Sequence, residues 1–240
     1  MTYLKKILIV GNMTSADVYK NPAIAENYDA ILAKRKSLCF FDTEYLRKNI
    51  KSGDRVLDLG CGTGRHLLGL CDLAEMTGID ISPKMIEIAD RKLKGKAKLI
   101  VGDIINVNSL VDGKFNVVLM MYHTLGSIDS SVSRADLFCQ INKLLKENGR
   151  LILHVHNRRH IKNLRFLLQR TKGDKIIKEG LLKGAIIHFF TKKEVEELAN
   201  EHGFKMEEVI CLKYPEEAEE IRGWKKYFCT GGYIFNLRKK

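Results

Sequence analysis

A glycine-rich segment with an acidic residue in front of it is the part of the chain best suited to chemistry. Residues 56–64 read VLDLGCGTG, an apolar run that predicts a buried strand, and a leucine-containing helical segment follows. Glycine lets a backbone approach a ligand closely and adopt positive φ without steric cost. The start of the helix adds free backbone amides. The segment therefore predicts a ligand-binding turn between a strand and a helix.

The acid in this segment indicates which ligand the turn favours. Dinucleotide-binding proteins place G-x-G-x-x-G in the same context, whereas this chain reads G-x-G-x-G with Asp58 two residues before Gly60. A carboxylate there disfavours a pyrophosphate, because like charges would face each other across a short gap. It suits a ligand with a cationic head, such as the ammonium and sulfonium of S-adenosylmethionine.

Two further acids follow later strand-like segments. Asp80 ends the second one, 20 residues after Gly60, where an acid can accept hydrogen bonds from both ribose hydroxyls. Asp103 follows the third and can accept from the adenine amino group, while Ile81 and Ile104 flank the ring. These acids indicate a bound nucleoside but do not by themselves choose the cofactor.

From Arg55 onward, short apolar runs alternate with segments of helical period, which predicts an α/β fold with a doubly wound, mostly parallel sheet. We expect strands at 55–59, 76–80, 97–101, 115–121, 150–156, 205–212 and 233–237. In open sheets of this kind, ligands bind at the carboxyl ends of the strands.

Several helix boundaries are marked by capping residues. Ser82 followed by proline predicts one helix start, and Thr191-x-x-Glu194 is a capping box that predicts another. Ser133 predicts the start of a third helix, which Gly149 is expected to end. Residues 19–46 look helical in part and would cover the mouth of the sheet, and residues 5–11 are an alternative extra strand.

We expect one domain of 240 residues. Its parts would be an N-terminal cap (1–50), a cofactor-binding core (51–156), a basic insertion or lid (157–190), and a C-terminal helix with a β-hairpin (191–240). No signal-peptide core and no apolar run long enough for a membrane span is present, so we expect a soluble, cytoplasmic protein with reduced cysteines.

Residues 52–156 resemble the core of the class I S-adenosylmethionine-dependent methyltransferases. The likeness rests on VLDLGCGTG, GIDISPKMI, VGDI, FNVVLMM and LLKENGRLIL, in that order. It implies a Rossmann-like, seven-stranded sheet with an antiparallel C-terminal strand pair, and S-adenosyl-L-methionine as cofactor. It also implies donor contacts from Asp58, Gly60, Gly62, Thr63, Gly64, Asp80, Ile81, Met85, Asp103, Ile104 and Met120.

The acceptor side is expected beyond the fourth and fifth strands, where Tyr122, His123, His156 and Asn157 stand. Methyl transfer requires an aligned nucleophile, and a general base matters only if the acceptor arrives protonated. Tyr122, His123 and His156 are the candidate catalytic residues, although a structural role for His123 is the simpler interpretation. His154 and His156 share a strand face, but without an acidic or thiol ligand beside them we expect no metal.

Residues 157–193 contain eleven Lys or Arg against Asp174 and Glu179, a net +9 of the formal +12 of the whole chain. Arg158, Lys162, Arg165 and Lys172 recur at helical spacing and, with Asn157, are candidate contacts for an anionic substrate.

Such a basic lid suits a small anionic acceptor or RNA, and a merely solvated face is the alternative. Residues 186–204 are also faintly similar to wobble-uridine transfer-RNA methyltransferases. A nicotinamide oxidoreductase and a donor-binding protein without catalysis are further alternatives. We expect no membrane partner, and the sequence leaves the oligomeric state open.

Overall fold

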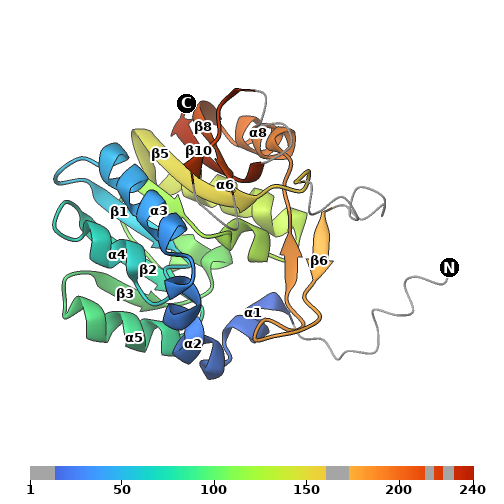
Figure 1. Cartoon of the computed structure of the whole chain (residues 1–240). Coiled ribbons are helices and arrows are strands. Elements are labelled where there is room, and N and C mark those ends of the chain that lie inside the picture. The colour runs from blue at the N-terminus through green and yellow to red at the C-terminus, as the bar shows by residue number, and fades with distance from the viewer. Residues whose placement is uncertain (1–13, 161–172, 214–218, 224–229) are drawn as a thin grey trace.

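A computed structural model describes residues 14–160, 173–213, 219–223 and 230–240. At its centre is a sheet in the order β3-β2-β1-β4-β5-β10-β8-β9 (Figure 1). The first five of these strands run parallel, and β10, β8 and β9 add antiparallel pairs. The strands are β1 (Arg55–Leu59), β2 (Glu75–Asp80), β3 (Lys98–Val101), β4 (Phe115–Met120), β5 (Leu145–His156), β8 (Phe204–Lys213), β9 (Glu219–Glu220) and β10 (Thr230–Lys239).

Helices cover both faces of this sheet, as the alternating apolar pattern requires. Val117 and Leu119 of β4 pack in one core with α3 (Lys36–Asn49), α4 (Arg65–Leu70) and α5 (Pro83–Leu93). Val118 and Met120 point to the other core, with η2 (Ile104–Ser109), α6 (Ser131–Leu144) and α8 (Lys192–Glu201). The doubly wound α/β class is confirmed.

The strand order reverses between β1 and β4, which both pair with parallel neighbours. A crevice at such a switch point is where open α/β sheets hold their ligands. Three segments gather at this end of the sheet: α1 (Ser15–Tyr19), α2 (Pro22–Ala33) and a two-stranded hairpin of β6 (Asp174–Ile176) and β7 (Ile186–His188) (Figure 1).

The hairpin β6–β7 and the N-terminal helices form a small core of their own. Val18 and Ile24 pack with Met85 of α5 and Ala185 of the hairpin. Ser15 Oγ donates to the carbonyl of Ile186 at 3.0 Å and accepts from its amide at 2.9 Å. The N-terminal segment and the insertion after β5 are therefore joined, which the sequence did not indicate.

Two boundary predictions were wrong. The third helix begins after Ser130, whose hydroxyl accepts from the amides of Val132 and Ser133, so Ser133 is not the cap. Gly149 does not end that helix, because the chain enters β5 at Leu145 and Asn148 takes the positive φ of 59°. The caps at Ser82 and Thr191 are confirmed.

The predicted seven strands become eight, since Glu219 and Glu220 pair with the end of β8. The alternative strand at 5–11 and the basic helical segment at 161–172 lie outside the described residues. The division of the chain into four parts stays a prediction. No helix of the described part is both long and apolar enough to cross a membrane.

Candidate active site

The glycine turn after β1 has the backbone conformation that its sequence predicts. Gly60, Gly62 and Gly64 have φ of 75°, 54° and 78°. The amide of Gly60 donates to the carbonyl of Ile79 at 2.8 Å, which ties the turn to β2. A Cβ at Gly60 would lie 2.7 Å from the side chain of Thr124. The turn therefore needs glycine both for its conformation and for its packing.

Asp58, two residues before Gly60, has a buried carboxylate that makes no hydrogen bond within the described structure. The residue is 1% exposed, and both of its carboxylate oxygens lack a partner. The imidazole of His66 lies beside it, with Nδ1 3.7 Å from Oδ2 of Asp58. A buried carboxylate without hydrogen bonds is costly unless a ligand completes its environment.

Asp80 lies at the end of β2 beside the same turn. One of its oxygens accepts from the amide of Gly62 at 2.8 Å, and the other accepts from the amide of Ser82 at 2.9 Å. Burial raises the pKa of Asp80, and these two amide bonds oppose the rise. Asp80 thus fixes the turn as well as standing where a ribose would bind. Asp103 similarly accepts from the amide of Ile105 at 3.1 Å.

The other predicted donor contacts divide into two groups. Ile81 is partly exposed at the end of β2, and Ile104 is 9% exposed beside Asp103. Met85 and Met120 are buried, at 3% and 0% exposure, and belong to the cores beneath the site. A direct contact from either methionine to the donor stays a prediction.

Thr63 connects the turn to the N-terminal cap. Its hydroxyl donates to Asp29 of α2 at 2.7 Å, and Lys92 of α5 pairs with the other oxygen of Asp29 at 2.5 Å. Tyr28 lies on the same helix, and a Cβ at Gly62 would be 3.4 Å from its ring. Helix α2 therefore packs directly on the glycine turn.

Comparison with known proteins assigns this arrangement to a family. A family model described as a methyltransferase domain matches residues 31–209. The chain belongs to the methyltransferase family. The class I assignment is confirmed, and the protein is an S-adenosylmethionine-dependent methyltransferase that uses S-adenosylmethionine as its cofactor.

Three similar proteins illustrate how far the likeness extends. An uncharacterised protein of Methanocaldococcus jannaschii is 27% identical over 197 residues, covering 76% of this chain and 74% of that protein. The demethylmenaquinone methyltransferase of Thermotoga maritima is 32% identical over 139 residues, covering 54% of this chain and 57% of the enzyme. A crystal structure of a SAM-dependent methyltransferase from Methanosarcina mazei has a TM-score of 0.66 at 23% identity, covering 81% and 96% of the two chains.

The residues of this methyltransferase fit the donor. The unpartnered carboxylate of Asp58 suits a cationic amino group, and the positive φ of Gly60, Gly62 and Gly64 gives the turn a backbone that a ligand can approach closely. Asp80 and Asp103 supply acceptors for hydroxyl and amino groups at the ends of the next two strands. When bound, the donor supplies a methyl group on a positively charged sulfur.

On the acceptor side, Tyr122 and His123 follow β4 with positive φ values of 53° and 76°. Two consecutive non-glycine residues in this region are strained, and the surrounding structure must hold them there. Nδ1 of His123 accepts from the amide of His156 at 3.0 Å, and the two rings stack with centroids 4.0 Å apart. The proton of the neutral His123 ring is therefore on Nε2.

The histidines here form a buried cluster with low basicity. Burial lowers the pKa of His123 and of His154 well below the usual range, and burial together with Arg35 lowers the pKa of His156 to about 3. Neutral imidazoles of this kind are poor acceptors for a proton from a hydroxyl group. The catalytic roles of Tyr122, His123 and His156 stay predictions.

Two of the five predicted anion contacts lie in the described part of the chain, and both are engaged elsewhere. The side chain of Asn157 donates to the carbonyl of Thr230 at 2.7 Å and accepts from the amide of Arg159 at 2.9 Å. Arg158 pairs with Glu194 of α8 at 3.8 Å. Lys162, Arg165 and Lys172 lie outside the described residues. Asn157 and Arg158 thus hold the base of the insertion, and their contact with substrate stays a prediction.

Sequence reasoning missed three side chains that the N-terminal helices bring to the site. Tyr19 Oη accepts from Ser127 Oγ at 3.1 Å, and the rings of Tyr28 and Tyr122 meet edge to face with centroids 6.5 Å apart. The guanidinium of Arg35 lies 6.0 Å from the centroid of the Tyr122 ring. Only the helical pattern of residues 19–46 pointed to this cap.

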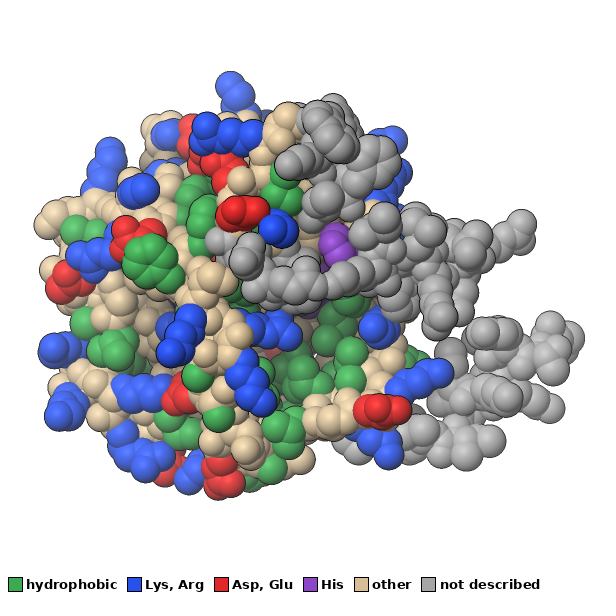
Figure 2. All heavy atoms as spheres, in the orientation of Figure 1, with side chains coloured by type: hydrophobic (Ala, Val, Ile, Leu, Met, Phe, Trp, Pro, Cys, Tyr) green, Lys and Arg blue, Asp and Glu red, His purple; other side chains and the backbone are tan. Residues whose placement is uncertain are grey.

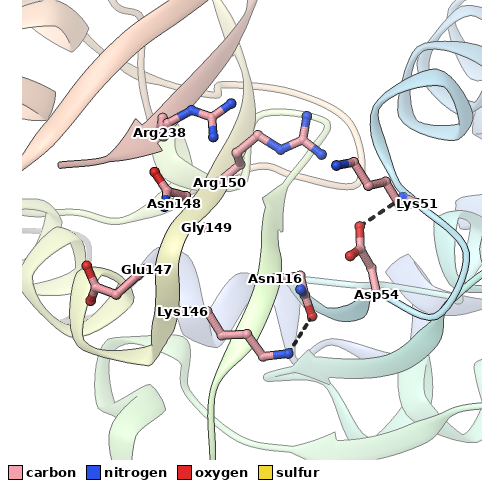
Figure 3. Close-up of a pocket in the computed structure, with 9 residues that line it drawn as sticks. All are labelled: Lys51, Asp54, Asn116, Lys146, Glu147, Asn148, Gly149, Arg150 and Arg238. Carbon is pink, nitrogen blue, oxygen red and sulfur yellow. Dashed lines mark hydrogen bonds between the residues drawn. The ribbon is translucent and has the colours of Figure 1, made fainter.

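A separate pocket of about 250 Å³ opens at the opposite, amino-terminal end of the strands (Figure 3). Two of its basic side chains have partners: Lys146 donates to Asn116 at 3.0 Å, and Arg238 pairs with Glu207. Because this pocket is at the end of the sheet opposite the donor turn, it is not the acceptor site. In the described part of the chain, no group of three or more His, Cys, Asp or Glu could hold a metal ion.

Proposed function

We propose that this methyltransferase modifies a small organic molecule, bound between the sheet and a roof formed by α1 and the hairpin β6–β7. The observation that carries the proposal is the pair of hydrogen bonds between Ser15 and Ile186, which joins the two halves of the roof. The amide of Ser15 also donates to Asp129 at 3.0 Å, beyond η3 (Thr124–Ser127). A site enclosed in this way suits a small acceptor better than a folded RNA.

The surface of this region supports the same proposal. Figure 2 shows a hollow on this face between the sheet and the hairpin, with hydrophobic side chains inside it and Lys or Arg side chains at its rim. Apolar walls with a few polar groups are typical of sites for small molecules. The Thermotoga maritima relative, demethylmenaquinone methyltransferase, is also named for a small-molecule acceptor.

In this proposal the chain acts mainly by positioning. Asp58 and Asp80 would hold the donor from one side, and Tyr122 and His156 would orient the acceptor from the other. Alignment of the nucleophile with the methyl carbon provides most of the rate enhancement. His123 accepts a hydrogen bond from the backbone amide of His156 and stacks on its ring. In this proposal His123 therefore positions His156 and does not remove a proton.

The test is to incubate the protein with isotopically labelled donor and a fractionated cell extract. We expect label in the small-molecule fraction, and an Asp58→Asn variant provides the background. Label that enters only RNA would contradict the proposal and favour the RNA alternative, for which the local charge of +9 in residues 157–193 is the argument.

A further inference from the structure

Arg35 is a basic side chain at the acceptor side of the site. It stands between α2 and α3, and its guanidinium lies 6.0 Å from the centroid of the Tyr122 ring. Tyr122 in turn contacts Tyr28, whose ring lies against the glycine turn at Gly62. The rings of Tyr28 and Tyr122 thus connect the donor turn to Arg35.

The charge of Arg35 reaches the groups around it. Its guanidinium opposes the rise that burial causes in the pKa of Tyr122 and of Cys39, and it adds to the lowering that burial causes in the pKa of His156. The nearby Arg65 donates to Asp42 at 3.2 Å and to the carbonyl of Cys39 at 3.0 Å, so it is held against α3. The charge of Arg35 thus acts on both Tyr122 and His156, the two side chains proposed to orient the acceptor.

The same region lacks a strong base for an acceptor hydroxyl. His156 has a pKa of about 3, and burial raises the pKa of Tyr122, so its phenol stays protonated at neutral pH. A hydroxyl acceptor that arrived protonated would have no good place to leave its proton among these groups. An acceptor that arrives as an anion needs no base.

We propose that the acceptor is an acidic small molecule, a phenol, enol or carboxylic acid, whose ionised oxygen is bound by Arg35 beside Tyr122. This inference rests on the proposed small-molecule function. In the reaction the ionised oxygen forms a bond to the methyl carbon while the carbon–sulfur bond breaks. The electron pair of that bond stays on sulfur, which becomes a neutral thioether, and the oxyanion becomes a neutral ether or ester. No proton is transferred.

The test uses 4-nitrophenol, because its ionised form has its own visible absorption. The phenol is titrated with protein saturated with S-adenosylhomocysteine, and the pKa of the bound phenol is read from the spectrum. We expect binding to lower that pKa by about one unit, equivalent to a tenfold preference for the anion. Arg35→Gln should remove the shift, and Arg35→Lys should restore part of it.

Lys34→Gln is the matched control, since Lys34 is the exposed neighbour that closes α2, and it should keep the full shift. Arg35 makes no side-chain cap bond to α3, so its replacement removes no helix cap. Unchanged binding of S-adenosylhomocysteine verifies folding of each variant. Failure of 4-nitrophenol to bind, an unshifted pKa, or a shift that survives in Arg35→Gln would overturn the inference. The extract experiment separately tests the small-molecule function, because it reports where label goes and not how an oxyanion is bound.

Discussion

Nε2 of His188 lies 2.6 Å from Oε1 of Glu194, so the hairpin β6–β7 is fastened to the first turn of α8. Nδ1 of the same ring lies 2.6 Å from Oδ1 of Asp174 in β6. Two carboxylates thus flank the imidazole, one at each ring nitrogen. This arrangement fixes the hairpin half of the proposed roof.

The contact between His188 and Glu194 predicts how the free energy of unfolding changes at low pH. Burial acts to raise the pKa of Glu194, but the hydrogen bond and charge of His188 lower it overall below the ordinary 4.5. A depressed carboxyl pKa stabilises the fold fully above the unfolded-state pKa and loses this contribution as pH falls through the folded-state pKa. Glu194→Gln should therefore reduce stability at neutral pH by about 1–2 kcal/mol, and the difference from wild type should shrink as the pH falls below about 4.5 and vanish below the folded-state pKa.

Urea unfolding at several pH values measures this difference. Glutamine keeps an acceptor for the amide of Thr191, so the capping box survives, while the charge that faces both His188 and Arg158 is removed. Glu197→Gln is the control, because Glu197 pairs only at the surface, with Lys193 at 3.4 Å. Equal losses in both variants, or a loss that does not depend on pH, would show that the link to His188 contributes nothing specific.

The buried carboxylate of Asp58 predicts opposite effects on binding and on stability. Asp58→Asn should weaken binding of S-adenosylmethionine by about 10- to 100-fold, since a charge-assisted contact contributes roughly 1.5–3 kcal/mol. The ligand-free variant should be as stable as wild type or more stable, because a buried charge without hydrogen bonds is removed.

Calorimetry checks the donor affinity and thermal unfolding checks the stability, with Asp90→Asn at an exposed position as control. Unaltered donor affinity would remove Asp58 from the site. The same titrations with NAD should show no comparable binding. NAD binding without donor binding would contradict the preference for S-adenosylmethionine that Asp58 indicates.

A comparison of Gly60 in the donor turn with Gly95 separates the effect of backbone strain from the effect of steric crowding. Gly60 and Gly95 have similar φ, 75° and 79°, but a Cβ at Gly60 would lie 2.7 Å from Thr124, whereas a Cβ at Gly95 would meet nothing within 4 Å. Both alanine variants should lose about 1–2 kcal/mol of stability from backbone strain. Only Gly60→Ala should also lose donor binding, because its turn must shift to relieve the contact. Equal donor affinity in the two variants would show that the turn tolerates a side chain.

The donor half of this site could be predicted from sequence because each part is local. A strand, its glycine turn and the next helix lie within residues 55–70, and the two later acids also end short strands. On the acceptor side, the position after the fourth strand pointed to Tyr122, whereas Arg35 could not be predicted because it comes from a segment far away in the chain. Hydrophobic period predicts helices in residues 19–46 but does not say which side chain will reach β4.

The errors at the end of α6 have a similar cause. Glycine is the usual residue for the positive φ that follows a helix, yet Asn148 takes this conformation and Gly149 continues in β5. The strand also starts early because Leu145 pairs with Phe115 across a register shift. Tertiary pairing thus decides a boundary at which the local signals favour a different residue.

The basic insertion provides a test that separates the two classes of acceptor. Lys162, Arg165 and Lys172 are changed to Glu together, while Arg158 is kept because it pairs with Glu194 at 3.8 Å. We expect unchanged donor binding and a loss of about three- to tenfold in activity on an acidic small acceptor, since charges beyond roughly 8–10 Å are largely screened by salt. Salt dependence should be shallow, and bulk transfer RNA should not compete.

An RNA acceptor would behave differently, because each phosphate that a basic side chain neutralises releases counterions. Transfer RNA would then bind with an affinity that falls steeply with added salt, and the three-site variant would lose most of that binding. Full activity in the variant would instead show that the insertion is a solvated face. In that case the positive charge that an anionic acceptor requires would come from Arg35 and not from the insertion, and the spectral shift of bound 4-nitrophenol should be the same in the variant as in the wild type.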